Sequence, residues 1–299
     1  MSYIEASNIS KSFESASGVR HVLDRVSLSV DRGEFVSVVG FMGCGKSTLM
    51  NVLCGVLQPN AGHISIDGER VQGVSTRASI VFQNYSLLPW FSALENVRLA
   101  VQAAYPDKSR AEQRAQAERY LGLVGLGGAL HRRPSQLSGG MRQRVAIARA
   151  FATHPEVLFL DEPFGALDAL TRGNLQQELA RLCQPGGPDS DVGPVTTVMI
   201  TNNLEEALLL SDRIIPMTRG PRATLGAPVA VELPRPRTAA QLMHDEQAIR
   251  ARAHVVESLT DQLESARGKR GSDPLFADGV KRGSDPISPP LAAAREVEL

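Results

Sequence analysis

The sequence is poor in cysteine, in aromatic residues and in long apolar runs, and it has no excess charge of either sign. Three cysteines occur among 299 residues, at Cys44, Cys54 and Cys183. This small, odd number excludes a disulfide scaffold and favours a reducing compartment. Lysine plus arginine and aspartate plus glutamate each total 32, so no global basic field attracts the chain to nucleic acid.

No apolar run reaches the roughly 18 residues of a transmembrane helix. The first residues, MSYIEASNISKSF, are too polar for a signal peptide. We therefore expect a soluble, intracellular protein that meets a membrane only through a partner. Hydrophobic residues make up 42% of the chain, enough for the core of one large or two small folded units.

The clearest chemical signal lies at residues 40–48, which read GFMGCGKST. They follow the apolar run 35–39 and precede a segment of helical composition, which gives the strand, glycine-rich turn and helix of a phosphate-binding loop. The glycines let backbone N–H groups turn toward phosphate oxygens, and the helix start adds further donors. Lys46 would neutralise the β- and γ-phosphates, and the Ser47 hydroxyl is placed to bind Mg²⁺.

The remaining patterns predict an α/β fold. Residues 3–39 alternate apolar and polar side chains, which indicates antiparallel strands that lead into a buried strand. The wholly apolar run 157–160 is typical of a central parallel strand that is covered on both faces. Residues 94–104, 109–124 and 137–153 show helical spacing and indicate a helical insertion between two α/β halves.

Two carboxylates, Asp161 and Glu162, follow the apolar run 157–160 directly. At the carboxyl end of a strand beside the phosphate loop, Asp161 suits a Mg²⁺ ligand. Glu162 could orient and deprotonate a water for attack on the γ-phosphate. The alternative is an ordinary acidic turn after a strand, but the phosphate loop upstream favours the chemical interpretation.

A second potential anion site lies at residues 137–144, which read LSGGMRQR. Ser138 has the character of a helix N-cap, and Gly139 and Gly140 leave backbone N–H groups accessible at the helix start. One nucleotide does not need two such sites in one chain. It does need them if two chains hold it between them.

With these motifs in this order, the sequence resembles the ATP-binding subunits of ABC transporters over roughly residues 3–233. GFMGCGKST corresponds to their Walker A motif, Gln83 to the Q-loop, LSGGMRQR to the signature and VLFLDE to Walker B. Asp168, in FGALD, corresponds to the D-loop. The resemblance implies a P-loop NTPase with a RecA-like core, an antiparallel β subdomain and a helical signature subdomain at about residues 85–153, within an ATPase domain at residues 1–233.

The resemblance also implies that the chain binds ATP and Mg²⁺. Phe13 would stack on the adenine, although it could equally be a core aromatic. The other implied nucleotide-binding residues form the loop itself: Gly40, Phe41, Met42, Gly43, Cys44, Gly45, Lys46, Ser47 and Thr48. Ser47, Gln83 and Asp161 would lie on the metal side of the site.

The resemblance assigns the catalytic roles to Glu162, Gln83 and Asn202. Ser138, Gly139 and Gly140 would contact the γ-phosphate held by a second protomer, and Asp168 would communicate across the dimer interface. ATP would then join two chains head to tail, and hydrolysis would separate them.

One position departs from the family pattern. The family usually has a histidine after the strand that corresponds to residues 196–201, whereas this chain has Asn202. An asparagine amide can donate a hydrogen bond but cannot become cationic or move a proton. We expect Asn202 to keep the positional contact while Glu162 acts as base. The alternative is a weak site that works beside a standard partner subunit in a heterodimer.

Three stretches are similar to the nitrate, nitrite and cyanate importers: residues 82–90 (FQNYSLLPW), 217–221 (MTRGP) and 233–237 (LPRPR). Sulfonate, taurine and bicarbonate uptake ATPases are close relatives of that group. Residues 85–90 would lie where a membrane permease docks, because interfaces favour apolar and aromatic anchors. The alternative is that Trp90 packs the helical subdomain.

The resemblance implies a set of partners and a location. The partners are a second ATPase subunit, identical or different, integral membrane permease subunits and, indirectly, a periplasmic substrate-binding protein, with no nucleic acid. The chain would lie peripherally on the cytoplasmic face of a bacterial inner membrane.

Other classes with a phosphate loop fit less well. Chromosome-maintenance ATPases of the ABC type insert a long coiled coil between the Q-loop and the signature, but the short stretch from Gln83 to Ser138 has no sustained heptads. Translation-factor relatives carry two ATPase units, and an ordinary P-loop kinase has no use for LSGGMRQR.

Composition changes after about residue 233. Residues 234–266 are expected to form a charged helical extension, either packed on the ATPase body or projecting into solvent. Residues 267–299 are rich in Gly, Ser, Asp and Pro and repeat KRGSDP at 269–274 and 281–286, which favours a disordered tail.

Overall fold

The computed structural model describes residues 2–15, 18–165, 167–183 and 194–270, with side-chain detail as far as residue 260. The chain divides into two compact units, Met1–Gln262 and Leu263–Leu299. The second copy of the KRGSDP repeat and most of the first lie outside the described residues. In the described part, no helix is both long and apolar enough to cross a bilayer.

The first sheet is antiparallel, as the alternating residues 3–39 predict. Its order is β2-β1-β4-β5. The strands are β1 (Ser2–Ser15), β2 (Gly18–Asp31), β4 (Ala61–Ile66) and β5 (Glu69–Arg70). Alternate side chains of β1 and β2, among them Ile4, Ile9 and Val26, are fully buried and turn toward the core.

The second sheet is mostly parallel and carries the site. Its order is β10-β9-β3-β8-β7-β6, and only β10 runs antiparallel to its neighbour. The strands are β3 (Phe35–Val39), β6 (Ala78–Val81), β7 (Val157–Asp161), β8 (Thr196–Thr201), β9 (Arg213–Pro216) and β10 (Val229–Ala230). The parallel strands β3, β6, β7 and β8 all end at one edge, where ligands bind in open α/β sheets.

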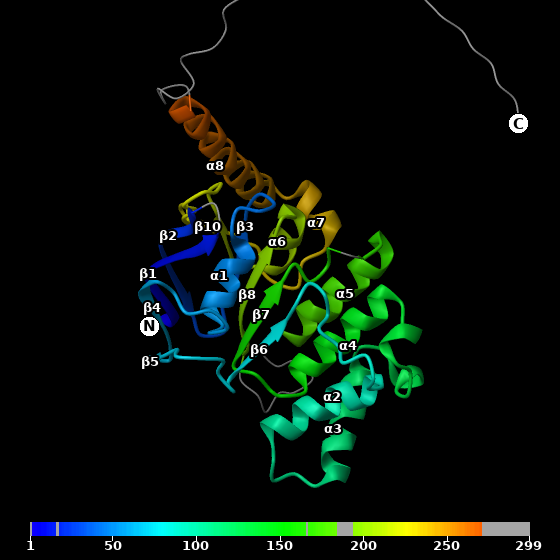
Figure 1. The fold of residues 1–299 in the computed structure, drawn as a ribbon. Helices are drawn as coiled ribbons and strands as arrows, with labels where there is room; N and C mark the ends of the chain where they lie inside the picture. The colour runs from blue at the N-terminus through cyan, green and yellow to red at the C-terminus, as the bar shows by residue number, and fades with distance from the viewer. Residues whose placement is uncertain (1, 16–17, 166, 184–193, 271–299) are drawn as a thin grey trace, which may run out of the picture. The chain divides into compact units, whose positions relative to one another are not determined.

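Burial on both faces explains the apolar run of β7. Leu158 and Leu160 join the core cluster that includes α4 (Gly139–Phe151) and α5 (Ala169–Leu182), whereas Val157 and Phe159 join the cluster of α1 (Lys46–Leu53) and the first sheet. Figure 1 shows α1 between the two sheets. The prediction of a central buried strand is confirmed.

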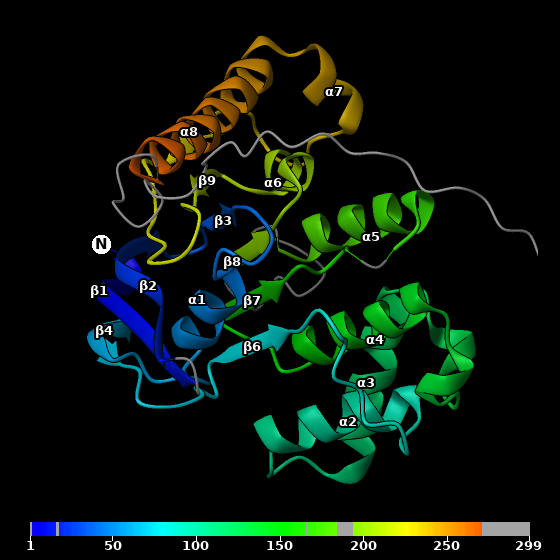
Figure 2. The ribbon, with the colours of Figure 1, turned by 45° about the horizontal axis from the view of Figure 1, so that its top comes forward.

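The helical insertion consists of α2 (Ala93–Ala104), α3 (Arg110–Leu123) and α4, joined by short 3-10 turns at Gly127–Ala129 and Pro134–Gln136. Figure 2 shows these helices gathered beside β6. α2 and α3 each begin at a capping box, in which Ser92 pairs with Glu95 and Ser109 with Glu112. These caps set the helix starts within two residues of the predicted ones.

The chain still packs against α6 and β9 beyond residue 233, the predicted end of the ATPase domain. The predicted extension forms two helices, α7 (Ala239–His244) and α8 (Glu246–Arg270), because the Asp245 side chain accepts hydrogen bonds from the Gln247 and Ala248 N–H groups and starts a new helix. Ala248, Ala251 and Val255 of α8 lie in one buried cluster with residues of α6 (Leu204–Leu210) and β9. Of the two alternatives, this part of the extension is packed on the body.

Arg237 anchors this junction. Its side chain is buried, with the residue only 6% exposed. The guanidinium donates to the backbone carbonyls of Leu208, Ser211, Val231 and Leu233. Burial lowers the pKa of Arg237 to about 10, still well above neutral, so the group stays charged and its acceptors stay paired.

Arg237→Ala should lower the free energy of unfolding by about 3 kcal/mol, because it leaves several buried carbonyls without a donor. Urea denaturation followed by circular dichroism measures the loss. Arg250→Ala is the matched control: Arg250 is an arginine on α8 whose side chain is 78% exposed, and its change should cost less than about 0.5 kcal/mol. Equal losses in the two variants would contradict the anchoring role.

Candidate functional site

The phosphate loop joins β3 to α1 at the carboxyl edge of the parallel sheet. Gly43 and Gly45 adopt φ values of 75° and 114°, in the region where a Cβ atom is strained. A Cβ on Gly45 would also lie 2.9 Å from Val22 Cγ1 on β2. The two glycines therefore allow the tight turn of the loop, and Gly45 packs directly against β2.

Lys46, the first residue of α1, holds its ammonium group inside this loop. The residue is 4% exposed, and Nζ donates to the carbonyl oxygens of Gly40 (2.9 Å) and Phe41 (3.0 Å). Glu162 Oε1 lies 3.7 Å from Nζ. The cation is thus fixed at the loop centre by local carbonyls and one carboxylate, in a low-dielectric setting that strengthens its attraction for an anion.

Asp161, the last residue of β7, lies next to the loop, as predicted. The Ser47 hydroxyl donates to Asp161 Oδ1 at 3.2 Å. Burial raises the pKa of Asp161, and the nearby Glu162 adds to the effect, whereas the Ser47 hydrogen bond and Lys46 oppose it.

A hydroxyl beside a carboxylate is a donor set that suits Mg²⁺. This ion takes one or two protein oxygens and completes its octahedron with phosphates and waters. Among the described residues, no group of three or more His, Cys, Asp or Glu side chains is arranged to hold a metal ion. Ser47 and Asp161 are two oxygen groups of the kind that Mg²⁺ takes from a protein.

Glu162 occupies the junction of three motifs. Its backbone has a φ of 44°, and its N–H donates to the carbonyl of Ile200 on β8. Its carboxylate accepts from the Gln83 amide at 3.2 Å and faces Lys46. The unusual backbone conformation turns the side chain toward the phosphate loop, which is the kind of local strain found at functional sites.

A pocket of about 420 Å³ opens over the phosphate loop. Its walls include Gly43, Gly45, Lys46, Ser47, Thr48, Glu162 and, on β1, Phe13. Phe13 is 38% exposed, which favours a contact with a ligand over the role of a core aromatic. Gly40, Phe41, Met42 and Cys44 belong to the loop but do not line this pocket.

Three further residues line the pocket that sequence reasoning missed, Ser15, Arg20 and Val22. Arg20 is the cross-strand partner of Phe13 in the β1–β2 hairpin. Directly paired residues project from the same face of a sheet, so the register brings Arg20 to the pocket. The sequence alone does not fix this register, because the two strands shift against each other at several bulges.

Gln83 and Asn202 lie at the same edge of the sheet, after β6 and β8, the two strands that flank β7. Gln83 follows β6 and contacts Glu162, but in the described structure no hydrogen bond links it to Ser47 or Asp161. Asn202 follows β8, which lies between β3 and β7, and its side chain is exposed. The adjacent Asn203 caps α6 by accepting from the Glu205 N–H.

The signature segment lies apart from this pocket. The Ser138 hydroxyl caps α4 by accepting from the Met141 N–H, as predicted, and Ser138 is exposed. Neither Ser138 nor Gly139 lines the pocket over the phosphate loop of its own chain. The signature segment and the pocket over the phosphate loop are therefore separate in this chain.

Gly140 shows why the signature needs a second glycine. A Cβ atom there would overlap the Cγ2 methyl of Thr171 in the first turn of α5. Thr171 donates its backbone N–H to Asp168, the N-cap of α5, and this hydrogen bond lowers the pKa of Asp168. The starts of the signature helix and of the helix after the D-loop are therefore in direct contact, although part of the D-loop, Ala166, lies outside the described residues.

The residues after Gln83 form a strained, partly exposed surface. Tyr85 and Ser86 have φ values of 64° and 45°, and their carbonyls accept hydrogen bonds from the partly buried guanidinium of Arg149 on α4. Trp90 is 63% exposed and makes an edge contact with Phe91. This exposure favours the docking interpretation of Trp90 over packing inside the helical group.

Gly140→Ala should lower the free energy of unfolding by about 1–3 kcal/mol, because the new methyl group collides with Thr171. Thr171→Ser removes the opposing methyl and keeps the hydroxyl. The double variant should therefore recover the loss and gain a few tenths of a kcal/mol from helix propensity. Denaturant unfolding of the four proteins measures the coupling, and strict additivity would contradict the contact.

Asp161→Asn should stabilise the metal-free protein at pH 7 while it lowers nucleotide hydrolysis on the order of 100-fold. The raised pKa means that the folded chain binds a proton more tightly than the unfolded chain, so this contribution to stability is present at low pH and is lost as pH rises through the folded pKa. Asparagine removes the buried charge but keeps an acceptor for Ser47. Denaturant unfolding at pH 4 and pH 7 checks the sign, and a variant less stable than wild type at pH 7 would contradict it.

Comparisons with known proteins agree with this geometry. A family model described as ABC transporter matches residues 23–165. The nitrate import ATP-binding protein NrtD of Synechococcus elongatus is 46% identical over 251 residues, which cover 84% of this chain and 89% of NrtD. The bicarbonate transport ATP-binding protein CmpD of Synechocystis sp. is 43% identical over 261 residues, which cover 87% of this chain and 90% of CmpD.

Other relatives are longer. The bicarbonate transport ATP-binding protein CmpC of Synechocystis sp. is 42% identical over 271 residues, and the chain spans 40% of its length. Among solved structures, the dimeric cassette MJ0796 in a post-hydrolysis state with ADP and Pi has a TM-score of 0.68 and 30% identity, over 77% of this chain and 99% of that one.

These matches confirm the predicted fold class, because the structural neighbours are ATP-binding cassettes that cover 77% of this chain. The identity to NrtD extends along nearly the whole of that protein. The chain therefore belongs to the ATP-binding proteins of ABC transporters.

Proposed function

We propose that the chain is the ATP-binding and ATP-hydrolysing subunit of an importer for a small anion, with nitrate, nitrite or cyanate as the substrate group. The single observation that carries the enzymatic part is the convergence of Lys46, Ser47, Asp161, Glu162 and Gln83 at one sheet edge. Similarity to NrtD supports the choice of nitrate. Similarity to CmpC and CmpD makes bicarbonate the second candidate, and sulfonate or taurine the third.

Each residue in the pocket has a defined task in hydrolysis. Lys46 exchanges its carbonyl partners for the β- and γ-phosphate oxygens, and Phe13 packs on the base. Ser47 and Asp161 would hold Mg²⁺, which would neutralise charge on the phosphates. Glu162 takes the proton of the attacking water, and the Gln83 amide keeps the Glu162 carboxylate aimed at it.

Hydrolysis also needs the signature of a second chain. Ser138, Gly139 and Gly140 lie away from their own nucleotide pocket, so they serve the γ-phosphate of a partner. Asp168 links the two sites because it caps the helix on which Gly140 packs. Closure on ATP and opening after cleavage supply the mechanical work.

The second chain is a different ATPase subunit. Two nitrate import ATP-binding proteins of one organism, NrtC and NrtD, both resemble this chain, which supports a pair of unlike subunits. Asn202 also fits this arrangement, since an amide cannot move a proton and a partner with the usual histidine can compensate.

Transport requires membrane partners. The exposed Pro89 and Trp90, next to the strained residues Tyr85 and Ser86, form the surface that receives a permease. The chain then lies peripherally on the cytoplasmic face of the inner membrane, and a periplasmic binding protein selects the anion. Residues 1–233 are the ATPase domain, and residues 85–153 its helical subdomain.

Glu162→Gln should bind MgATP with near wild-type affinity and hydrolyse it at least 100-fold more slowly, because only the base is lost. Isothermal titration and a phosphate-release assay measure the two quantities on the assembled transporter. Glu257→Gln, an exposed glutamate on α8, is the matched control and should keep full turnover. Equal turnover in the two variants would contradict the assignment of the base.

The transported anion is tested in cells. A deletion strain should lose growth on nitrate as its nitrogen source and regain it with the wild-type chain but not with Glu162→Gln. Normal growth on nitrate together with a lost bicarbonate or sulfonate response would transfer the proposal to that substrate.

A further inference from the structure

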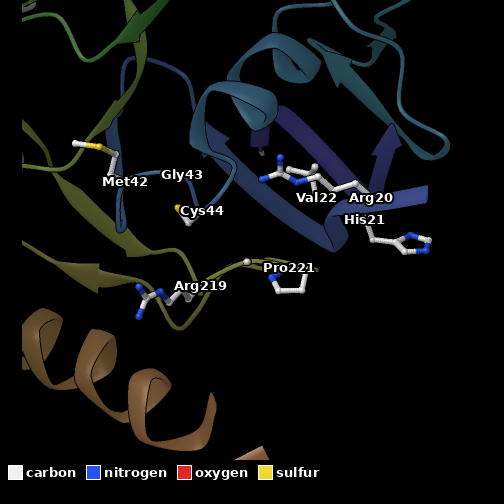
Figure 3. Close-up of a pocket in the computed structure, with 9 residues that line it drawn as sticks. Arg20, His21, Val22, Met42, Gly43, Cys44, Arg219 and Pro221 are labelled. Carbon is white, nitrogen blue, oxygen red and sulfur yellow. The ribbon is translucent and has the colours of Figure 1, made fainter. Parts of the chain in front are cut away.

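A pocket of about 240 Å³ adjoins the phosphate loop, but its basic side chains do not converge. Figure 3 shows Arg20, His21 and Arg219 pointing in different directions, and Arg219 lies over the Phe41 ring. Polar groups converge instead at the end of β8, around the carboxylate of Glu206 on α6.

Glu206 is a buried carboxylate to which the proposed hydrolysis assigns no task. The residue is only 4% exposed. Burial raises its pKa, and the nearby Glu162 adds to the effect, whereas the Thr201 hydroxyl and the charge of Arg172 oppose it. A buried carboxylate costs free energy unless polar partners compensate, so its contacts are what allow α6 to carry it.

This carboxylate joins the residues on both sides of Asn202. Oε2 accepts from the hydroxyl of Thr201, the last residue of β8, at 2.7 Å. Oε1 accepts from the side-chain amide of Asn203, the N-cap of α6, at 3.4 Å. The Thr201 hydroxyl oxygen accepts in turn from the Asn203 N–H at 3.0 Å. Asn202, which is itself exposed, therefore lies in a turn that Glu206 closes from inside.

A cation on the neighbouring helix connects this turn to the D-loop segment. Arg172 of α5 places Nε 4.0 Å from Glu206 Oε1, and its Nη2 donates to the Leu167 carbonyl at 2.8 Å. Leu167 directly precedes Asp168, the N-cap of α5. Figure 2 shows α5 and α6 on neighbouring paths beside β8. A chain of polar contacts thus runs from the start of α5 to the turn that holds Asn202.

The contact between Arg172 and Glu206 is longer than a hydrogen bond. Arg172 Nε is buried and has no hydrogen-bond partner in the described part of the chain. A buried donor without an acceptor costs free energy. A displacement of about 1 Å between the starts of α5 and α6 would bring the two groups within hydrogen-bond distance. The contact therefore responds to small movements of the D-loop segment.

We propose that Glu206 is a positioning residue that fixes Asn202 and ties it, through Arg172, to the D-loop segment. The proposal rests on the proposed ATPase function, in which Asn202 keeps a contact with the γ-phosphate. Glu206 does not line the pocket over the phosphate loop, so it acts through Asn202. A movement of Asp168 at the contact with a second subunit reaches the γ-phosphate position by this route.

The first experiment measures ATP hydrolysis by the assembled transporter. Glu206→Gln offers an acceptor to only one of its two donors, so kcat should fall about tenfold, the loss of one hydrogen bond to a charged group. The KM for ATP should stay within about twofold, because the phosphate loop is untouched. Glu206→Ala offers no acceptor and should be slower than Glu206→Gln. Glu205→Gln is the matched control, since the exposed Glu205 pairs with Arg252 on α8 and should keep full turnover.

The second experiment tests the link through Arg172. Arg172→Gln should also lower kcat, but its effect should be about threefold smaller in the Glu206→Gln background, because both changes remove one contact. Arg181→Gln, at an exposed arginine of the same helix, is the control and should have no effect in either background. Fully additive losses would overturn the link to the D-loop segment.

The third experiment reads the turn without ATP hydrolysis. Hydrogen exchange of the Asn203 N–H, which donates to Thr201, should be about tenfold faster in Glu206→Gln than in Glu205→Gln. Thermal melts of all variants establish that they fold. A purely structural role would lower the melting temperature without changing kcat at temperatures where the variant is folded.

Equal kcat values in Glu206→Gln and Glu205→Gln, beside an active wild type, would overturn the proposal. A wild-type transporter that hydrolyses no ATP would instead contradict the proposed ATPase function. In that case the exchange rates still decide whether Glu206 holds the turn around Asn202, and equal rates in the two variants would show that it does not.

Discussion

The site depends on one buried ammonium group held among two backbone carbonyls and one carboxylate. Lys46 is nearly inaccessible, and its charge is balanced by the carbonyls of its own loop and by Glu162. At the low effective dielectric of such a position, a charge left without partners would be costly. Three features bring those partners close to the Lys46 ammonium group: the strand ends, the positive φ of Glu162 and the glycines of the loop.

The parallel sheet is what makes this convergence possible. Because β3, β6, β7 and β8 run in the same direction, the residues that follow each of them emerge at one edge. Residues separated by more than 100 positions, such as Ser47 and Asp161, then form a direct hydrogen bond. The antiparallel sheet adds Phe13 and Arg20 from the side, so residues of both sheets line the pocket.

The signature region shows how packing connects the start of α4 with the start of α5. Gly140 touches the first turn of α5, and Asp168 caps that same turn. A displacement of the start of α4 therefore displaces the start of α5. Arg149, further along α4, holds the carbonyls of Tyr85 and Ser86 near the exposed Trp90. One helix, α4, thus touches the first turn of α5 and the segment that carries the surface proposed for the permease, and we propose it as the physical route between the two.

The sequence by itself determined what depends on short-range order: the phosphate loop with Lys46 and Ser47, the carboxylates Asp161 and Glu162 after an apolar run, and the helix that begins at Ser138. Each is encoded by neighbouring residues whose periodicity or turn chemistry is local. Only the tertiary structure decided that Arg20 lines the pocket, that Gly140 meets Thr171, that Arg149 holds the segment after Gln83 and that Arg237 anchors the extension. These contacts join distant segments through strand register and helix packing, which no local pattern specifies.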